Sequence, residues 1–394
     1  MVVKNGYKKT EVGLIPDDWD VCSVGSKGQV LTGKALAVKA PGKQRPYLRT
    51  KNVFDGRIDI EDVLMMPMTE EQFLQFSVRY GDVLLNEGQS LELVGRCAMY
   101  RGEYPEPCAI QNQLIRFRAN RDVSAPFASY VFRHCQQSGI FSRIALQTTS
   151  IAHLGGSRFK RLVIAWPNSE IEQRNIAEAL SDVDALLGSL DRLIVKKRDL
   201  KQAVMQQLLT GQTRLPGFHG EWEVKRLGDV VQIQKGQLIT SSTLSPGNVP
   251  VIAGGKQPAY FHATANRFGR TVTISASGAS AGYVALYKEP IFASDCSTIG
   301  EGKHYSLDFF FYQLQCKQQS IFKAQTGGAQ PHIHAKDLNP IPFSIPPLPE
   351  QTAIAKVLSD MDTELSALEQ RRNKTRDLKQ AMMQELLTGR IRLV

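Results

Sequence analysis

One stretch of the chain occurs twice, and this repeat constrains the fold more than any other feature of the sequence. Residues 172–215 align without a gap to residues 350–393, at an offset of 178, and 25 of the 44 aligned positions are identical. Identity at this level predicts that both copies adopt one structure. The segments before the copies repeat only weakly. The chain therefore alternates variable and shared blocks, with boundaries at 1–169, 170–215, 216–349 and 350–394.

The spacing of apolar residues predicts that each shared block forms one long helix. Apolar side chains recur at alternating intervals of four and three, at Ile176, Leu180, Val183, Leu187, Leu190 and Ile194 in the first copy and at Ile354, Leu358, Met361, Leu365 and Leu368 in the second. This is the a/d pattern of a coiled coil. We expect the two helices to pack antiparallel on each other; the alternative is that each packs only on its own domain.

The apolar pattern shifts its register toward the end of each helix. It continues through Leu200, Val204 and Leu208, and equally through Leu378, Met382 and Leu386. Both blocks then end in LLTG, which places Gly211 and Gly389 as C-terminal caps. At the N-terminal ends, Glu172 and Glu350 suit the helix dipole.

The variable blocks are predicted to be compact and rich in β-structure. Short runs such as GDVLLN, LIRFRAN, TVTISASG and GYVALYKEP alternate with Gly and Pro turns. The stretches APFASYVFRHCQQ and DFFFYQLQCKQQ are predicted helices that pack on the sheets. The predicted fold class is therefore α+β: two β-rich α/β domains joined by two long antiparallel coiled-coil helices, with a pseudo-two-fold internal repeat. The C-terminal LTGRIRLV resembles the internal junction LTGQTRLPGFHGEW, so we expect the chain ends to lie close together.

The distribution of charge points to a polyanion as the partner of the variable blocks. The net charge is +10, of which residues 1–169 carry +6 and residues 216–349 carry +3, whereas the shared blocks carry 0 and +1. Nucleic acid is the first candidate for such a partner. No apolar run reaches the ~18 residues of a membrane helix. The N-terminal MVVKNGYKKT lacks the apolar stretch of a secretion signal, so we expect a cytoplasmic protein without a membrane partner.

Three motifs suggest chemistry but are incomplete. The run GQVLTGK, from Gly28 to Lys34, is followed by Ala35, where a P-loop needs Ser or Thr to bind Mg²⁺. The run NPIPF, from Asn339 to Phe343, differs at Ile341 from the Asn-Pro-Pro-aromatic signature of adenine methyltransferases, and a turn leading into a strand is the preferred interpretation. His332 and His334 form an HxH pair without further clustered metal ligands. We therefore predict no catalytic residue and no metal site.

The whole layout resembles one known family. Two variable blocks, each followed by EQxxIA, LSDxD, RDLKQA and LLTG, together with TGGAQPHIHAKDLNPIPFSIPPLPEQ, resemble the specificity subunit of type I restriction-modification enzymes. The resemblance implies a subunit without catalytic activity. Its two target recognition domains would each read one half of a split double-stranded DNA sequence, and its paired helices would set the gap between the halves. It also implies docking of two modification subunits, which bind S-adenosylmethionine and methylate adenine, and of motor-nuclease restriction subunits. No cofactor is expected in this chain.

Candidate DNA contacts are polar or basic residues beside Gly turns or at equivalent positions of the repeat, because such side chains can reach a DNA groove. In the first variable block they are Arg45, Arg49, Lys51, Asn86, Gln89, Arg96, Gln147, Ser150, His153 and Arg158. In the second they are Lys256, Tyr260, Ser277, Ser280, Tyr283, Gln330, His332, His334 and Lys336. For partner docking on the helices, the candidates are Asp182, Asp184, Arg198, Asp360, Asp362 and Arg376, with pairing on the helix surface as an equal alternative.

Two other classes of function remain open at this point. A self-contained DNA-modifying enzyme of the adenine-methyltransferase type would transfer methyl groups, or cleave DNA, without partners. A protein scaffold that never contacts DNA is disfavoured, because the excess positive charge lies on the variable blocks.

Overall fold

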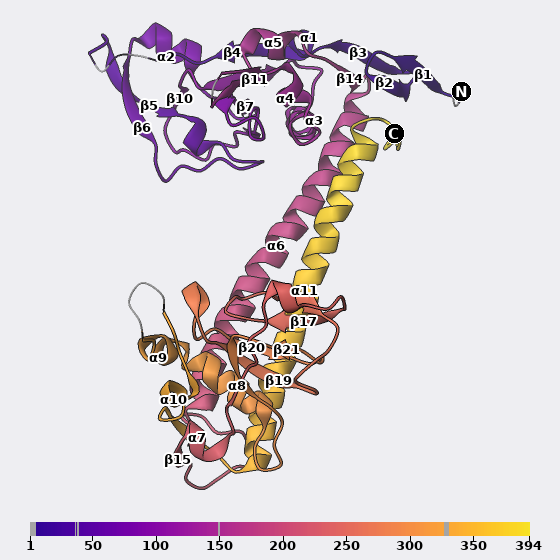
Figure 1. The fold of residues 1–394 in the computed structure, drawn as a ribbon. Coiled ribbons are helices and arrows are strands. Elements are labelled where there is room, and N and C mark those ends of the chain that lie inside the picture. Colours follow the sequence, from indigo (N-terminus) through magenta and orange to yellow (C-terminus); the bar gives the residue numbers. More distant parts are fainter. Residues whose placement is uncertain (1–4, 36, 38, 149, 327–330) are drawn as a thin grey trace. The chain divides into compact units, whose positions relative to one another are not determined.

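The computed structural model describes residues 5–35, 37, 39–148, 150–326 and 331–394. It divides the chain into two compact units. Unit 1 combines residues 1–189 with residues 372–394, and unit 2 consists of residues 190–371. Both ends of the chain therefore belong to unit 1 (Figure 1).

Unit 1 is built on a four-stranded antiparallel sheet in the order β4-β11-β7-β9. Its strands are β1 (Tyr7–Thr10), β2 (Gly13–Pro16), β3 (Trp19–Ser23), β4 (Gly28–Thr32), β5 (Lys43–Leu48), β6 (Leu64–Met68), β7 (Val83–Asn86), β8 (Gly88–Gln89), β9 (Cys97–Met99), β10 (Ala109–Ile110), β11 (Leu114–Ala119), β12 (Leu146–Gln147), β13 (Ala152–His153) and β14 (Val163–Pro167). Its shorter helices are α1 (Val24–Lys27), α2 (Glu70–Phe76), α3 (Ala125–Gln137), α4 (Ile140–Ile144) and α5 (Gly156–Arg161).

The core of unit 1 forms where helix α3 packs on this sheet. Ser124 caps α3 by accepting a hydrogen bond from the Phe127 amide at 3.4 Å. Phe132 of α3 then meets Phe117 of β11 edge to face, with ring centroids 4.9 Å apart, and both are fully buried. Smaller sheets, β10-β5-β6 and β12-β13-β8, extend the domain beyond this core.

Unit 2 repeats the plan of unit 1. Its strands are β15 (Glu223–Arg226), β16 (Gln234–Lys235), β17 (Val249–Ile252), β18 (Tyr260–His262), β19 (Thr271–Ser275), β20 (Val284–Tyr287), β21 (Phe292–Ala293), β22 (Cys296–Ile299) and β23 (Pro342–Ile345), and its shorter helices are α7 (Leu227–Val230), α8 (Leu307–Cys316), α9 (Gln318–Lys323) and α10 (Ala335–Leu338). The central sheet has the order β16-β22-β19-β20, the counterpart of β4-β11-β7-β9. In both units the second sheet has three strands and contains a parallel pair, β5 with β10 and β17 with β21.

These elements confirm the α+β class and the internal repeat predicted from sequence. The run GQVLTGK begins as strand β4, which is paired with β11, and does not form a phosphate loop. The run NPIPF forms the turn after α10 and the start of β23, with Phe343 fully buried, as the preferred interpretation required.

The two shared blocks form the long helices α6 (Glu170–Leu209) and α11 (Leu348–Leu386). Within unit 1, Ile176 and Leu180 of α6 share one core cluster with Met383 and Leu386 of α11. Within unit 2, Leu208 shares a core cluster with Ile354 and Leu358. In each unit the start of one helix therefore lies beside the end of the other, which is the antiparallel pairing predicted (Figure 1). Gly211 and Gly389 follow the helices with φ of 75° and 71°, as expected for C-terminal caps.

The predicted register after the shift is wrong at its first position. Leu200 and Leu378 are 49% and 57% exposed, whereas the neighbouring residues Lys201 and Lys379 face the opposite helix. Each lysine reaches an aspartate there, Lys201 to Asp362 at 2.5 Å in unit 2 and Lys379 to Asp184 at 2.6 Å in unit 1. The ion pairs take the place that hydrophobic spacing assigned to leucine, because a buried charge needs an opposite charge in contact.

The repeated Glu-Gln pair attaches each domain to its helix. Gln173 accepts a hydrogen bond from the Ser124 amide at 2.9 Å and donates one to the Pro167 carbonyl at 3.0 Å. Gln351 does the same in unit 2, with the Ser306 amide at 2.9 Å and the Pro346 carbonyl at 2.9 Å. A buried side chain that must accept and donate at once explains why glutamine stands in both copies.

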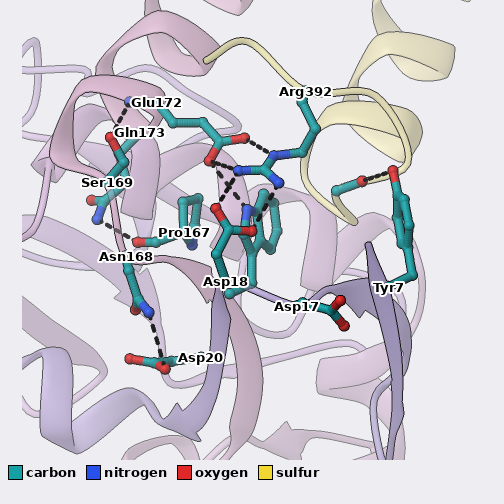
Figure 2. Close-up of polar contacts among 12 residues, drawn as sticks. Tyr7, Asp17, Asp18, Asp20, Pro167, Asn168, Ser169, Glu172, Gln173 and Arg392 are labelled. Atoms are coloured by element: carbon teal, nitrogen blue, oxygen red, sulfur yellow. Dashed lines mark hydrogen bonds and ion pairs between the residues drawn. The ribbon is translucent and has the colours of Figure 1, made fainter. Parts of the chain in front are cut away.

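The two chain ends are tied together inside unit 1, which confirms the predicted closure. Arg392 holds Asp18 through two hydrogen bonds of 2.8 Å and Glu172 through contacts of 2.5 and 2.8 Å (Figure 2). Tyr7 donates to the Gly389 carbonyl at 3.0 Å. In unit 2 the internal junction takes this role, because Arg214 binds both oxygens of Glu350 at 2.6 Å.

Candidate nucleic-acid interface

In unit 1, four of the ten predicted contacts gather at the small sheet β12-β13-β8. Gln89 lies on β8, His153 on β13 and Gln147 on β12, paired in register through Ala152. Ser150 lies in the turn between β12 and β13 and is exposed, like Gln147. Sequence positions that are more than 50 residues apart are thus brought to one sheet.

His153 and the predicted contact Arg158, which lies on α5, are held by specific hydrogen bonds. His153 Nδ1 lies 2.9 Å from Glu87 Oε2, which fixes the orientation of the ring and leaves Nε2 on the other side. Arg158, on α5, donates to the carbonyls of Leu154 at 3.0 Å and His153 at 2.7 Å. Since no carboxylate neutralises Arg158 among the described contacts, its positive charge is available to a phosphate.

The basic residues of β5 and the turn after it form a separate group. Arg45 pairs with Glu70 at 2.6 Å, and Arg49 and Lys51 share Asp62 at 2.6 and 2.9 Å. Acidic neighbours therefore compensate part of the charge that sequence alone assigns to DNA binding.

Asn86 and Arg96 differ sharply in exposure although both flank the same turn. Asn86 is fully buried and donates to the Val53 carbonyl at 3.1 Å, which gives it a structural place in this conformation. Arg96 stacks on the ring of Phe54, with 4.8 Å from the guanidinium carbon to the ring centroid. Burial lowers the pKa of Arg96, and the described contacts give its guanidinium no carboxylate in hydrogen-bond distance. Arg96 is half-buried, and the charge of Asp55 opposes part of the effect of burial on the pKa, but its guanidinium forms no described ion pair. An arginine without a bound carboxylate suits a phosphate or a guanine edge.

In unit 2, four predicted contacts gather around one cavity of about 390 Å³. His334 and Lys336 line it together with Lys235 and Asp295. Ser277 donates a hydrogen bond to Asp295 and forms a backbone bridge with His332, whose ring stacks on that of His334 at 6.1 Å. The cavity therefore combines three cationic or imidazole side chains with one carboxylate.

Four of the remaining predicted contacts of unit 2 lie within the described residues. Lys256 sits over the Tyr283 ring at 5.6 Å, and Tyr260 on β18 is 43% exposed. The Ser280 carbonyl accepts a hydrogen bond from the Tyr283 amide at 2.9 Å, which places the two in one turn. Gln330 lies outside the described residues.

The predicted docking residues of the helices divide into exposed and paired ones. Asp182, Asp360 and Arg376 are exposed, and Asp360 contacts Lys356 one turn away at 3.0 Å. Arg198 forms an ion pair with Glu369 within unit 2. Asp184 and Asp362 each form an ion pair with a lysine of the other helix, Lys379 and Lys201 respectively. Asp184 also accepts a hydrogen bond from Tyr130 at 2.9 Å, and Asp362 accepts one from Tyr312 at 2.7 Å.

Burial shapes the ionisation of this pairing in unit 1. Burial would raise the pKa of Asp184, but the hydrogen bond from Lys379 and the charge of Arg133 outweigh it and hold that pKa below its usual value. Burial and the nearby Asp184 raise the pKa of Tyr130. The carboxylate is thus kept charged and the phenol neutral, so that the phenol can donate.

Sequence reasoning missed Gln113 and Asp295, which stand just before β11 and β22. Both are partly exposed; Asp295 accepts a hydrogen bond from Ser277, and Gln113 Oε1 lies beside the backbone of Gly88. Their equivalence is hidden in the sequence, because the two blocks differ in length by one residue just before them. Gly33 lies against the carbonyl of Gln111, two residues before Gln113, whereas Gly236 lies against the carbonyl of Ser294, one residue before Asp295. The signal that could have found them is a polar residue at the entry to a central strand in both blocks.

The fold and this interface define a class of protein. Residues 16–194 and 219–375 match the family model described as the type I restriction modification DNA specificity domain, and the chain belongs to this family. A Methanocaldococcus jannaschii protein assigned as the MjaX type I restriction enzyme specificity subunit is 27% identical, over 99% of this chain and 97% of its own length. The MjaVIII specificity subunit of the same organism is 22% identical over the same shares. The crystal structure of the type I restriction-modification S subunit from M. genitalium has a TM-score of 0.62 at 18% identity, over 98% of both chains.

No described helix is both long and apolar enough to cross a membrane. Within the described ranges, no group of three His, Cys, Asp or Glu side chains is arranged to hold a metal ion.

Proposed function

We propose that this chain is the DNA sequence-specificity subunit of a type I restriction-modification complex. Residues 1–169 and 216–349 are target recognition domains 1 and 2, and each binds one half of a bipartite double-stranded DNA target. Residues 170–215 and 350–394 are the central and C-terminal conserved helices, which set the spacer between the halves. The observation that carries this proposal is the repetition of one domain plan with different polar side chains at its exposed sites, because two similar readers with unlike surfaces suit two unlike half-sites.

The proposed DNA contacts follow from exposure and unpaired charge. In domain 1 they are Gln89, Arg96, Gln147, Ser150, His153 and Arg158, with Arg45, Arg49 and Lys51 as secondary phosphate contacts. In domain 2 they are Lys256, Tyr260, Ser277, Ser280, Tyr283, His332, His334 and Lys336. We leave Asn86 out because it is fully buried.

The proposed partners supply the chemistry that this chain lacks. Two modification subunits dock on the helices, with Asp182, Asp360 and Arg376 as exposed contacts, and carry S-adenosylmethionine for adenine methylation. Restriction subunits join for cleavage, and the complex acts on DNA in the cytoplasm. The repeat supports two equivalent docking positions, because a pseudo-two-fold scaffold offers the same surface twice.

The test is co-expression of this chain with its modification subunit in a host without methylation, followed by genome-wide mapping of methylated adenines. We expect one split motif with a fixed gap. Inserting one base pair into the gap of a synthetic target should abolish specific binding. Methylation without a split motif, or equal binding to random duplex at moderate salt, would contradict the proposal. Methyl transfer by this chain alone would instead establish the self-contained enzyme.

A further inference from the structure

We infer that Gln113 and Asp295 occupy equivalent base-reading positions in the two domains, that Gln113 reads an adenine, and that Asp295 reads a cytosine. This inference rests on the proposed function and names the chemistry by which the two half-sites differ. It is drawn within each unit separately, from hydrogen bonds that repeat between them.

Backbone hydrogen bonds establish the equivalence. In unit 1 the Glu87 amide donates to the Gln113 carbonyl at 2.9 Å, and the Glu87 carbonyl accepts from the Leu154 amide at 2.8 Å. In unit 2 the Ala276 amide donates to the Asp295 carbonyl at 3.1 Å, and the Ala276 carbonyl accepts from the Ile333 amide at 2.9 Å. Gln113 and Asp295 therefore stand at the same corner of the same backbone arrangement.

The side chains also reach the same neighbour. Gly88 pairs with His153, as Ser277 pairs with His332, so Gly88 and Ser277 are equivalent. A Cβ built on Gly88 would lie only 2.6 Å from Gln113 Oε1, whereas in unit 2 the Ser277 hydroxyl donates to Asp295 Oδ2. The longer glutamine thus stands against a glycine, and the shorter aspartate is met by a serine hydroxyl in the corresponding place.

Hydrogen-bonding capacity differs between the two side chains. The amide of Gln113 both donates and accepts, which matches N7 and the N6 amine of adenine in the major groove. The carboxylate of Asp295 only accepts, which matches the N4 amine of cytosine and repels the acceptor atoms of guanine. Beyond Ser277, the described contacts give the carboxylate of Asp295 no cation within 4 Å and no other side-chain donor.

The surroundings of Asp295 allow a carboxylate to approach DNA. Lys235, His334 and Lys336 line the same cavity and offset the repulsion between Asp295 and phosphates. A carboxylate at such a surface weakens binding to any base that offers it no donor, so it acts mainly through discrimination.

The decisive experiment exchanges the pair between the domains. Ser277→Gly with Asp295→Gln should change one C·G pair of one half-site to A·T and leave the other half unchanged. Gly88→Ser with Gln113→Asp should make the reciprocal change in the other half. The readout is the methylated motif mapped in cells that co-express the modification subunit. We expect discrimination at the affected pair to change by roughly 5- to 150-fold. Glu289→Gln, an exposed carboxylate of unit 2, is the matched control and should leave the motif as it is.

The outcomes separate this inference from the proposed function. If the unmodified chain yields no split motif, the proposed function itself fails. If the unmodified chain yields a motif and every exchange leaves it unchanged, the inference is refuted and the proposed function stands. Where an exchanged variant no longer assembles with the modification subunit, the near-isosteric Asp295→Asn and Gln113→Glu decide instead. Retention of the original discrimination in both would overturn the inference.

Discussion

Replacing Asp184 by Asn should loosen the helix pair of unit 1. The carboxylate accepts hydrogen bonds from Lys379 at 2.6 Å, Tyr130 at 2.9 Å and Arg133 at 3.1 Å. Breaking a buried ion pair by removing one partner costs about 3–5 kcal/mol, because the other charge stays buried. The side chain of Asp184 is 34% exposed and that of Lys379 is 9% exposed, so solvent screening reduces the expected loss to about 2–3 kcal/mol.

The assay is hydrogen exchange of the α6 amides between residues 176 and 189 in the full-length chain. A loss of about 2–3 kcal/mol corresponds to exchange that is roughly 30- to 150-fold faster. The control is Asp182→Asn, two residues away and exposed, which should change exchange by less than a factor of about three. The double variant with Lys379→Met should recover part of the loss. Strict additivity of the two single losses, within about 0.5 kcal/mol, would refute the reasoning.

The pH dependence follows from the lowered pKa of Asp184. A carboxyl group whose pKa is lower in the folded than in the unfolded state contributes stability above its unfolded pKa of about 4. This contribution is lost as the pH falls through the folded value. The difference in the free energy of unfolding between the native chain and Asp184→Asn should therefore be largest at pH 7 and should decrease below about pH 4.

Three further predictions concern the core, the chain ends and DNA binding. Leu180→Ala should lower the free energy of unfolding in urea by about 2–5 kcal/mol, because Leu180 is fully buried. Leu200→Ala should lower it by less than about 0.5 kcal/mol, because Leu200 is 49% exposed. Equal losses for the two variants would show that Leu200 does lie in the helix interface. Arg392→Gln should accelerate hydrogen exchange of the amides of residues 7–16 at pH 7. The difference in exchange rate from the native chain should become smaller below about pH 4, since the hydrogen bond from Arg392 lowers the pKa of Asp18. A difference in exchange rate that stays constant across pH would contradict this prediction. Arg96→Gln should lower DNA affinity and reduce its salt dependence by about one phosphate contact. Arg45→Gln should lower the affinity less, because the Arg45 guanidinium already pairs with Glu70. A larger loss of affinity for Arg45→Gln than for Arg96→Gln would show that Arg96 does not contact DNA.

The long helices and the internal repeat could be predicted from sequence because their signals are local or repeated. Ile176 and Leu180 follow a helical spacing, and Gly389 ends the second copy as it ends the first. Apolar spacing predicts Leu200 at the helix interface, because spacing carries no information on an aspartate of the other helix. The ion pair of Lys201 with Asp362 joins residues 161 positions apart, which spacing within one helix cannot reveal.

Contacts between residues far apart in the sequence also explain which features of the candidate site could not be predicted. Arg45 and Lys51 read as free positive charges until the fold brings Glu70 and Asp62 beside them. Gln113 and Asp295 read as unrelated residues until the backbone hydrogen bonds place them at the same corner. Chemistry of single residues could be read from the sequence, but compensation of charge and equivalence between domains required the fold.

The division of the chain between the units has a consequence for its biosynthesis. Unit 2 is one continuous segment, residues 190–371, whereas the core of unit 1 includes Met383, Leu386 and Leu387 from the very end of the chain. All residues of unit 2 are therefore synthesised before the last apolar residues that complete the core of unit 1. The unit translated first must wait until residues 383–387 have been added, and a premature stop after residue 371 would leave unit 1, rather than unit 2, with an open core.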